Sequence, residues 1–137
     1  MIYAVIDTNV IVSALFTSNI EAATVKVFNA ILQGQIVPLY NKEIYEEYKE
    51  VLNRPKFHFP HSIIKQYLKA IQELGMEIER VHCSSEEFPD MDDIVFYEVA
   101  MSKDDAYLVT GNTKHFPKSP IVVTPAEMMQ ILMGKPI

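Results

Sequence analysis

A chain of 137 residues fits a single domain and is long enough to bury a real hydrophobic core. Its 49% hydrophobic and 22% charged residues exclude a disordered or fibrous protein, and its one cysteine excludes both an intramolecular disulfide and a cysteine-ligated zinc site. The net charge of −6 argues against a broadly basic nucleic-acid surface, although acids gathered in one pocket can be neutralised by a divalent cation.

The first residues show no pattern typical of export. MIYAVIDTNV has no positively charged start and its first apolar run stops at Asp7, so we expect no signal peptide. The next apolar stretch, 10–16, is interrupted by Ser13 and is far shorter than the ~20 residues that cross a membrane. We therefore expect a cytoplasmic protein without a membrane partner.

The first third of the chain predicts two strands separated by helices. Ile2–Ile6 is an apolar run without alternation, which is typical of a parallel strand covered on both faces. After a turn, apolar periodicity predicts helices over 10–16 and 21–33. A second strand is predicted over 36–39, where Pro38 near its end indicates an outer position in the sheet.

Two further helices and a short strand follow. Asn41 fits the N-cap of a helix over 42–53, and a second helix over 61–74 is closed by Gly75. Residues 77–81 alternate in polarity and form a candidate strand.

The last third predicts a buried helix, two strands and a closing helix. The helix over 94–102 is apolar nearly all round, with one glutamate as the main exception, and is therefore expected to be buried. Strands are predicted over 106–110 and 121–123. Thr124 and Glu127 then form a capping box at the start of a final helix.

This order of elements predicts an α/β fold. Strands separated by helical stretches imply a three-layer sandwich, in which a central, mostly parallel sheet lies between helices. We find no repeat, low-complexity segment or flexible linker, so residues 1–137 are expected to form one domain.

Two polar residues follow strands of this predicted sheet. In open parallel sheets, ligands bind beyond the carboxyl ends of the strands, where the strand order reverses. Asp7 directly follows the first predicted strand, and Asn112 comes just after the strand over 106–110. Both residues are therefore candidates for chemistry.

Among the four glutamates of the helix over 42–53, Glu47 is nearest to the apolar stripe. At about 100° per residue, the other three point away from that stripe, whereas Glu47 lies on its border. A half-buried glutamate at the edge of a stripe is also common without any function, and that alternative stays open.

Three aspartates end the acidic turn EEFPDMDD before the buried helix. Asp93 lies on the same helical face as Phe96 and Ala100, so its carboxylate is expected to point toward the interior or a cleft. The alternative is helix capping, a role that Asp90 fills well and Asp92 acceptably.

These acids together predict a metal site. Asp7, Glu47 and Asp93 come from three distant segments that can meet at one switch point, and burying several ionised carboxylates without partners is very costly. The segments hold few basic residues, whereas Mg²⁺ or Mn²⁺ takes oxygen ligands and keeps several waters. Such an ion activates a bound water and polarises a phosphoryl oxygen.

Four motifs of the chain resemble the PIN-domain family. They are IDTNVIVSAL, EEYKEVLNRPKF, DMDD and YLVTGNTKHFP, in this order over residues 1 to about 125. They are most similar to a bacterial and archaeal branch whose members are described as toxins of toxin–antitoxin pairs. The resemblance implies a PIN-like sandwich with ribonuclease activity.

The resemblance also implies roles for the acids. Asp7, Glu47 and Asp93 would be the first, second and third metal-binding and catalytic acids. The family often has an aspartate after the TG of its fourth motif, where this chain has Asn112, which offers an amide oxygen without negative charge. Asn112 and Asp92 are then secondary site residues.

Three more residues match family positions that orient the acids by hydrogen bonds. They are Asn9, Ser13 and Thr110. A purely structural alternative for all three is turn and helix capping.

Similar proteins cut RNA phosphodiester bonds and leave a 5′-phosphate and a 3′-hydroxyl. The resemblance implies in-line attack of a metal-activated water on phosphorus. Asp7 and Asp93 would be the principal ligands, and Glu47 would position the metal or the water.

Basic residues flank two of the motifs and are candidates for RNA-phosphate binding. Arg54 and Lys56 follow the Glu47 helix, and Lys114 and His115 follow Asn112. The alternative is an ordinary solvated loop. Four aromatic residues could stack on unpaired bases, although core packing is the favoured role for most of them: Tyr40, Phe57, Phe59 and Phe116.

Two other enzyme classes fit the sequence less well than a ribonuclease, and a module that does not cleave RNA is a further alternative. A phosphatase of the haloacid dehalogenase type expects a second aspartate two residues after the first, where this chain has Asn9, and no G-x-G-x-x-G for a dinucleotide follows the first strand. A PIN-like module that binds RNA or a protein partner without cleaving remains an alternative because of Asn112. The resemblance further implies a small antitoxin partner and a homodimer.

Overall fold

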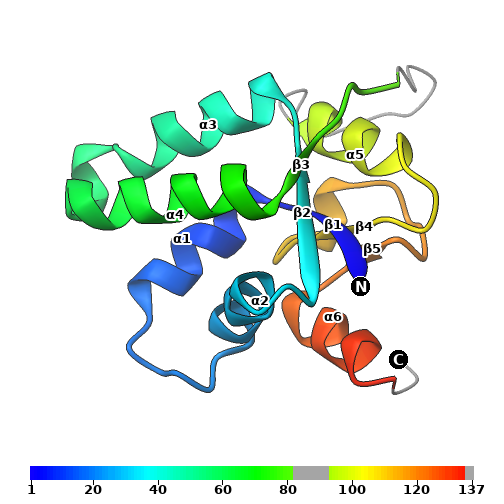
Figure 1. Ribbon diagram of the computed structural model, residues 1–137, viewed down its shortest axis with the longest axis horizontal. Coiled ribbons are helices and arrows are strands. Elements are labelled where there is room, and N and C mark those ends of the chain that lie inside the picture. The colour runs from blue at the N-terminus through cyan, green and yellow to red at the C-terminus, as the bar shows by residue number, and fades with distance from the viewer. Residues whose placement is uncertain (82–92, 135–137) are drawn as a thin grey trace.

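The computed structural model describes residues 1–81 and 93–134 of the chain. In these residues, five parallel strands form one sheet with the order β3-β2-β1-β4-β5, flanked by helices (Figure 1). The α/β class and the parallel sheet predicted from the sequence are confirmed. The strands are β1 (Ile2–Ile6), β2 (Ile36–Tyr40), β3 (Met76–Glu77), β4 (Tyr107–Val109) and β5 (Val122–Val123).

The register of the sheet places two predicted site segments next to each other. Ile6 of β1 pairs with Val109 of β4, so the two strands end level. The chain leaves β1 toward β2 on one side and reaches β4 on the other side, which makes the β1–β4 junction the point where strand order reverses. Asp7 and Thr110 are the first residues beyond this junction.

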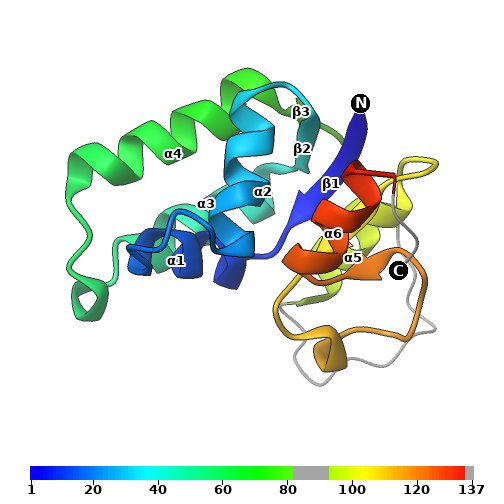
Figure 2. The same ribbon diagram turned by 90° about the horizontal axis from the view of Figure 1, so that it is seen from below.

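Helices cover both faces of the sheet. α2 and α5 lie on opposite sides of it, and α3 and α4 form an antiparallel pair (Figure 1). α6 packs next to α2 (Figure 2). No helix in the described parts of the chain is both long enough and apolar enough to span a bilayer. The α-helices are α1 (Thr8–Phe16), α2 (Ala23–Leu32), α3 (Lys42–Leu52), α4 (His61–Leu74), α5 (Ile94–Met101) and α6 (Pro125–Leu132).

Local signals fixed most helix boundaries correctly. The Asn41 side chain accepts a hydrogen bond from the Ile44 backbone at the start of α3, and Gly75 ends α4 as predicted. Thr124 and Glu127 form the predicted capping box at the start of α6. The exception is α1, which begins at Thr8 directly after β1, without the expected turn.

Two strand predictions were wrong in part. The strand expected over 77–81 is reduced to β3, and the outer position expected for Pro38 is wrong, because β2 lies between β1 and β3. β3 pairs only with Leu39 and Tyr40, so Pro38 lies outside the paired stretch on that side. Gly75 fits here because a Cβ would lie 2.5 Å from the Pro38 carbonyl oxygen.

Helix α5 lies in the core, as its nearly uniform apolarity predicted. Its side chains from 95 to 100 are all buried, including that of Glu98. The Glu98 carboxylate lies 3.4 Å from Arg80 Nε, and this pairing lowers the cost of burying the charge. The buried α5 therefore fixes the position of Asp93 at its start.

Candidate active site

An open pocket of about 350 Å³ lies beyond the carboxyl ends of β1 and β4. Residues of α1, α3 and the start of α5 line it, so the three acids predicted from the sequence lie in one pocket. The lining residues are Asp7, Thr8, Asn9, Val12, Glu47, Val51, Arg54, Phe57, Asp93, Asn112 and His115.

Asp7 is the buried acid of this pocket. It precedes α1 and is only 7% exposed. Thr110 Oγ1, itself fully buried, donates a hydrogen bond of 2.7 Å to Asp7 Oδ2. Burial raises the pKa of the Asp7 carboxyl, while the Thr110 hydroxyl and the backbone N–H groups of Thr8 and Asn9 oppose this rise. Asp7 is thus a desolvated carboxylate that a nearby cation would stabilise.

Tyr48 connects the strand that carries Asp7 to the helix that carries Glu47. Its hydroxyl donates a hydrogen bond to the Ile6 carbonyl, one residue before Asp7, and its side chain is buried. Burial, with the nearby carboxylates of Asp7 and Glu47, raises the pKa of the Tyr48 phenol well above its usual value. Tyr48 therefore stays a neutral donor. Its position in the helical period places Tyr48 on the apolar stripe of α3, and no local pattern indicates this hydrogen bond.

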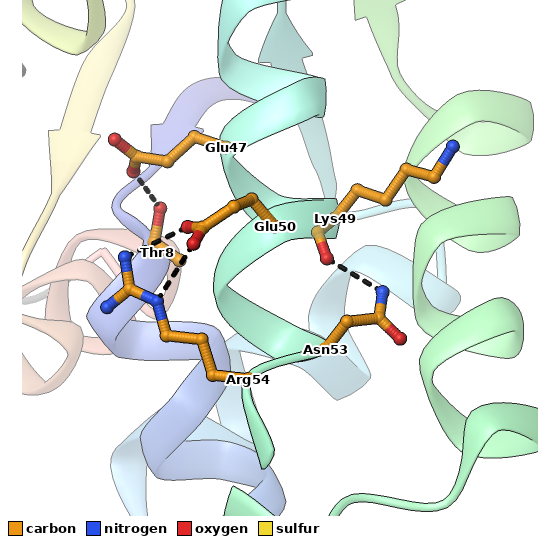
Figure 3. A network of polar contacts seen from close by, with 6 residues as sticks. All are labelled: Thr8, Glu47, Lys49, Glu50, Asn53 and Arg54. Carbon is orange, nitrogen blue, oxygen red and sulfur yellow. Dashed lines mark hydrogen bonds and ion pairs between the residues drawn. The ribbon is translucent and has the colours of Figure 1, made fainter. Parts of the chain in front are cut away.

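Glu47 faces α1 from the border of the α3 stripe. Thr8 Oγ1 donates a hydrogen bond of 2.5 Å to Glu47 Oε2, as Figure 3 shows. Glu47 is half-buried, whereas the other three glutamates of α3 are exposed, as the helical geometry predicted. The role of Thr8 was not predicted from the sequence. Its position between Asp7 and Asn9, two predicted site residues, could have indicated it.

Asp93 lies at the amino end of α5. It occupies the N-cap position, but its side chain makes no capping hydrogen bond, so the capping alternative is not supported for Asp93. Its Oδ2 atom lies 3.5 Å from Nδ1 of His115, which follows β4. Asp90 and Asp92, the other candidates for capping or site support, lie outside the described residues.

The loop after β4 is tied to α1. Asn9 Oδ1 accepts a hydrogen bond of 3.3 Å from the Gly111 backbone, and the Asn112 backbone donates one of 3.0 Å to Thr110 Oγ1. Thr110 thus links Asp7 to Asn112, and Asn9 holds the loop. Ser13, the third predicted supporting residue, is exposed on α1 and does not line the pocket.

Three of the four predicted basic residues line one of two hollows, and Lys56 lines neither. Arg54 lines the acidic pocket and binds Glu50 with two hydrogen bonds of 3.1 and 2.9 Å (Figure 3), and His115 lines the same pocket. Lys56 Nζ lies 5.1 Å from the centre of the Phe57 ring. Lys114 instead lines a second hollow of about 460 Å³ next to β5.

The chemistry of this second hollow differs from that of the acidic pocket. The one carboxylate among its lining residues is Glu127, whose Oε1 accepts a hydrogen bond from the Thr124 backbone in the capping box. Phe116, Lys114 and Lys118 line the rest. This second hollow therefore lacks converging acids. The acidic pocket at Asp7 is the better candidate for catalysis, although it is the smaller of the two.

The acidic pocket offers the donors that a Mg²⁺ or Mn²⁺ ion prefers. Three carboxylates and the Asn112 amide provide hard oxygen ligands. Among residues 1–81 and 93–134, however, no three histidine, cysteine, aspartate or glutamate side chains are close enough to enclose a metal. The donor set therefore fits an ion held by one or two carboxylates and completed by water.

Comparison with protein families gives one match. Residues 3–114 match the family model of the PIN domain. This segment includes Asp7, Glu47, Asp93 and Asn112, and it ends before β5 and α6. A search of curated proteins finds no match.

Proposed function

The chain belongs to the PIN-domain family, whose members are generally metal-dependent nucleases, and from this premise we propose that it is a Mg²⁺- or Mn²⁺-dependent endoribonuclease. The observation that carries the proposal is the gathering of Asp7, Glu47 and Asp93 in one pocket, although Asp7 follows β1, Glu47 lies in α3 and Asp93 precedes α5. A site of purely structural acids would not need carboxylates from three distant segments.

Asp7 and Asp93 are the proposed principal ligands of the ion, because one is desolvated and the other heads a buried helix. Glu47 would position the ion or the attacking water. Such an ion supplies a water of lowered pKa and polarises a phosphoryl oxygen.

The chain's own residues would hold the reacting groups in place. Thr110 and Tyr48 fix the carboxylate and the backbone at Asp7, and Thr8 fixes one oxygen of Glu47. Water would attack phosphorus in line with the 3′ oxygen. The P–O3′ bond then breaks, the 3′ oxygen leaves as a hydroxyl after gaining a proton, and a 5′-phosphate remains.

A role as the toxin of a toxin–antitoxin pair is the finer proposal. It rests on the likeness of the four motifs to that branch of the family. A small antitoxin that blocks the pocket, and a homodimer, would be the corresponding partners.

A second candidate function is a PIN-like module that binds RNA or a protein without turnover. Asn112 favours it, because an amide replaces the carboxylate that the family often has at this position. Incubation with Mn²⁺ and RNA would separate the two functions. An enzyme should cleave the RNA and release products, whereas a binding module should retain the RNA and release none.

The proposed function is tested with purified protein and a mixed RNA substrate, with Mn²⁺ or with a chelator. We expect cleavage with Mn²⁺ and products that carry a 5′-phosphate. Asp7→Asn should abolish cleavage, whereas Asp104→Asn should not, because Asp104 is exposed beyond the amino end of β4. Cleavage retained by folded Asp7→Asn protein, or cleavage unaffected by the chelator, would refute the assignment.

A further inference from the structure

Three phenylalanines gather beside the acidic pocket. Phe16 is the last residue of α1, Phe57 lies in the short 3₁₀ helix after α3, and Phe59 precedes α4. The Phe57 and Phe59 rings stack with centroids 5.3 Å apart and planes at 14°. Phe16 meets both rings edge-on, at 5.4 and 5.1 Å. We call these three residues the phenylalanine cluster.

The phenylalanine cluster lies at the edge of the hydrophobic core, against which only Phe59 packs. Phe16 is 59% exposed, and the other two side chains are only partly buried. A contiguous group of partly exposed aromatic rings is a candidate for a contact with another molecule. Core packing, which the sequence favoured for Phe57 and Phe59, is therefore not their whole role.

The backbone holds the cluster in a fixed shape. His58, between the two stacked rings, has a φ of 55°, in the left-handed region that non-glycine residues adopt only rarely. This conformation allows residues two apart to stack. Pro55 and Pro60 flank the turn and restrict the backbone further. The rings are thus presented as a preformed surface.

The cluster is continuous with the proposed catalytic pocket. Phe57 lines that pocket together with Asp7, Glu47 and Asp93. The segment 53–62 carries Arg54, Lys56 and two histidines but no carboxylate, in a protein with a net charge of −6. An aromatic surface, local positive charge and a phosphodiester-cleaving site therefore lie side by side.

We infer that the phenylalanine cluster binds an unpaired RNA base next to the phosphate held in the acidic pocket. The inference rests on the proposed ribonuclease function and adds a base-binding surface to that site. Bases stack on exposed aromatic rings with little sequence preference, whereas the bases of a duplex are already stacked on one another. Lys56 and Arg54 would contact the phosphates on either side.

The first test uses the absence of tryptophan from the chain. In Phe16→Trp protein, the new indole is the sole tryptophan, and a short single-stranded RNA should quench its fluorescence in a saturable way. The measurement is made with a chelator, so it does not depend on cleavage. A duplex of the same sequence should quench much less. Leu74→Trp, at the carboxyl end of α4 and about 20 Å along that helix from its first residue, is the matched control and should not respond.

The second test removes the exposed ring. Phe16→Ala should weaken single-strand binding by about tenfold and raise KM with little change in kcat, whereas Phe16→Trp should keep wild-type affinity. RNA binding measured by anisotropy without quenching of Phe16→Trp would overturn the inference, as would an absence of binding. It would also be overturned if Phe16→Ala changed only self-association, because the cluster would then be a protein contact.

The two proposals fail in different ways. Quenching and binding without any Mn²⁺-dependent cleavage would contradict the ribonuclease function and leave the base-binding surface standing. Cleavage that is equally efficient in wild type and Phe16→Ala would contradict the base-binding surface alone.

Discussion

The floor and the rim of the acidic pocket are built differently. We define the floor as Asp7, which lines the pocket, together with Tyr48 and Thr110, which support it from the buried side; these side chains are at most 7% exposed. Its hydrogen bonds join residues 42 and 103 positions apart in the chain. On the rim, the side chains of Arg54 and His115 are 44% and 50% exposed, and Arg54 bonds to a residue only four positions away.

This difference suits the floor to catalysis and the rim to substrate binding. Buried donors that are already in place lower the cost of organising charge during a reaction. Exposed side chains held by local contacts can instead adapt to a flexible ligand. We therefore expect substitutions in the floor to change stability and turnover, and substitutions in the rim to change affinity and its salt dependence.

The largest effect is expected for Asp7→Asn. Loss of the buried carboxylate should reduce Mn²⁺-dependent cleavage by roughly a thousandfold or more. The same variant should be more stable than wild type at neutral pH without metal, because it removes a carboxylate whose ionisation is opposed by burial. Added Mn²⁺ should stabilise wild type but not the variant. Denaturant unfolding with and without Mn²⁺ checks this.

The pH dependence of this stability difference follows from the direction of the pKa shift. The Asp7 pKa is raised above 3.8 in the folded protein. Its contribution to stability is therefore fully present below pH 3.8 and is lost as the pH rises through the raised pKa. The gain from Asp7→Asn should be small in acid and grow toward neutral pH; a gain independent of pH would contradict the assigned cause.

The next largest effect is expected for Thr110→Val, which removes the donor to Asp7 but keeps the branched shape. Cleavage should fall about 10- to 100-fold, and unfolding free energy by about 1–3 kcal/mol, because a buried hydrogen bond is lost. Thr110→Ser restores the hydroxyl and should recover most of the activity. Equal losses in both variants would indicate a packing role alone.

A smaller effect, and a gain rather than a loss, is expected for a substitution at Asn112, which lies between the floor and the rim. Asn112→Asp adds a carboxylate to the pocket and should tighten Mn²⁺ binding by on the order of tenfold, through charge attraction. Isothermal titration with Mn²⁺ measures the change. If affinity is unchanged, Asn112 lies too far from the ion to be a ligand.

The smallest effect is expected at the rim, for Arg54→Ala. The midpoint of unfolding should not change measurably, because Arg54 and Glu50 form an exposed pair within one turn. RNA binding should weaken, and the slope of log K against log salt should decrease by about one. Lys69→Ala, on α4 and paired with Glu73, is the matched control with no expected change in the slope.

Several predictions from the sequence succeeded because they depend on neighbouring residues. The capping residues Asn41 and Thr124 act within one helical turn, and the position of Glu47 follows from the period of its own helix. The outer position predicted for Pro38 was wrong because β3 pairs only with Leu39 and Tyr40. A proline can therefore lie in an inner strand without losing a hydrogen bond to β3. Glu98 is the one acid of the helix predicted to be buried, and its partner Arg80 comes from a segment that no local pattern links to it.

Most helices and strands, the parallel α/β class and the choice of three acids that share one pocket could be predicted from sequence, since periodicity, capping and apolar runs act over short stretches of chain. Three contacts could not be predicted: Thr8 binds Glu47, Tyr48 binds the strand before Asp7, and Thr110 binds Asp7. These partners are 39, 42 and 103 residues apart. Such pairs form only when packed elements bring distant segments together, and no local pattern encodes that distance.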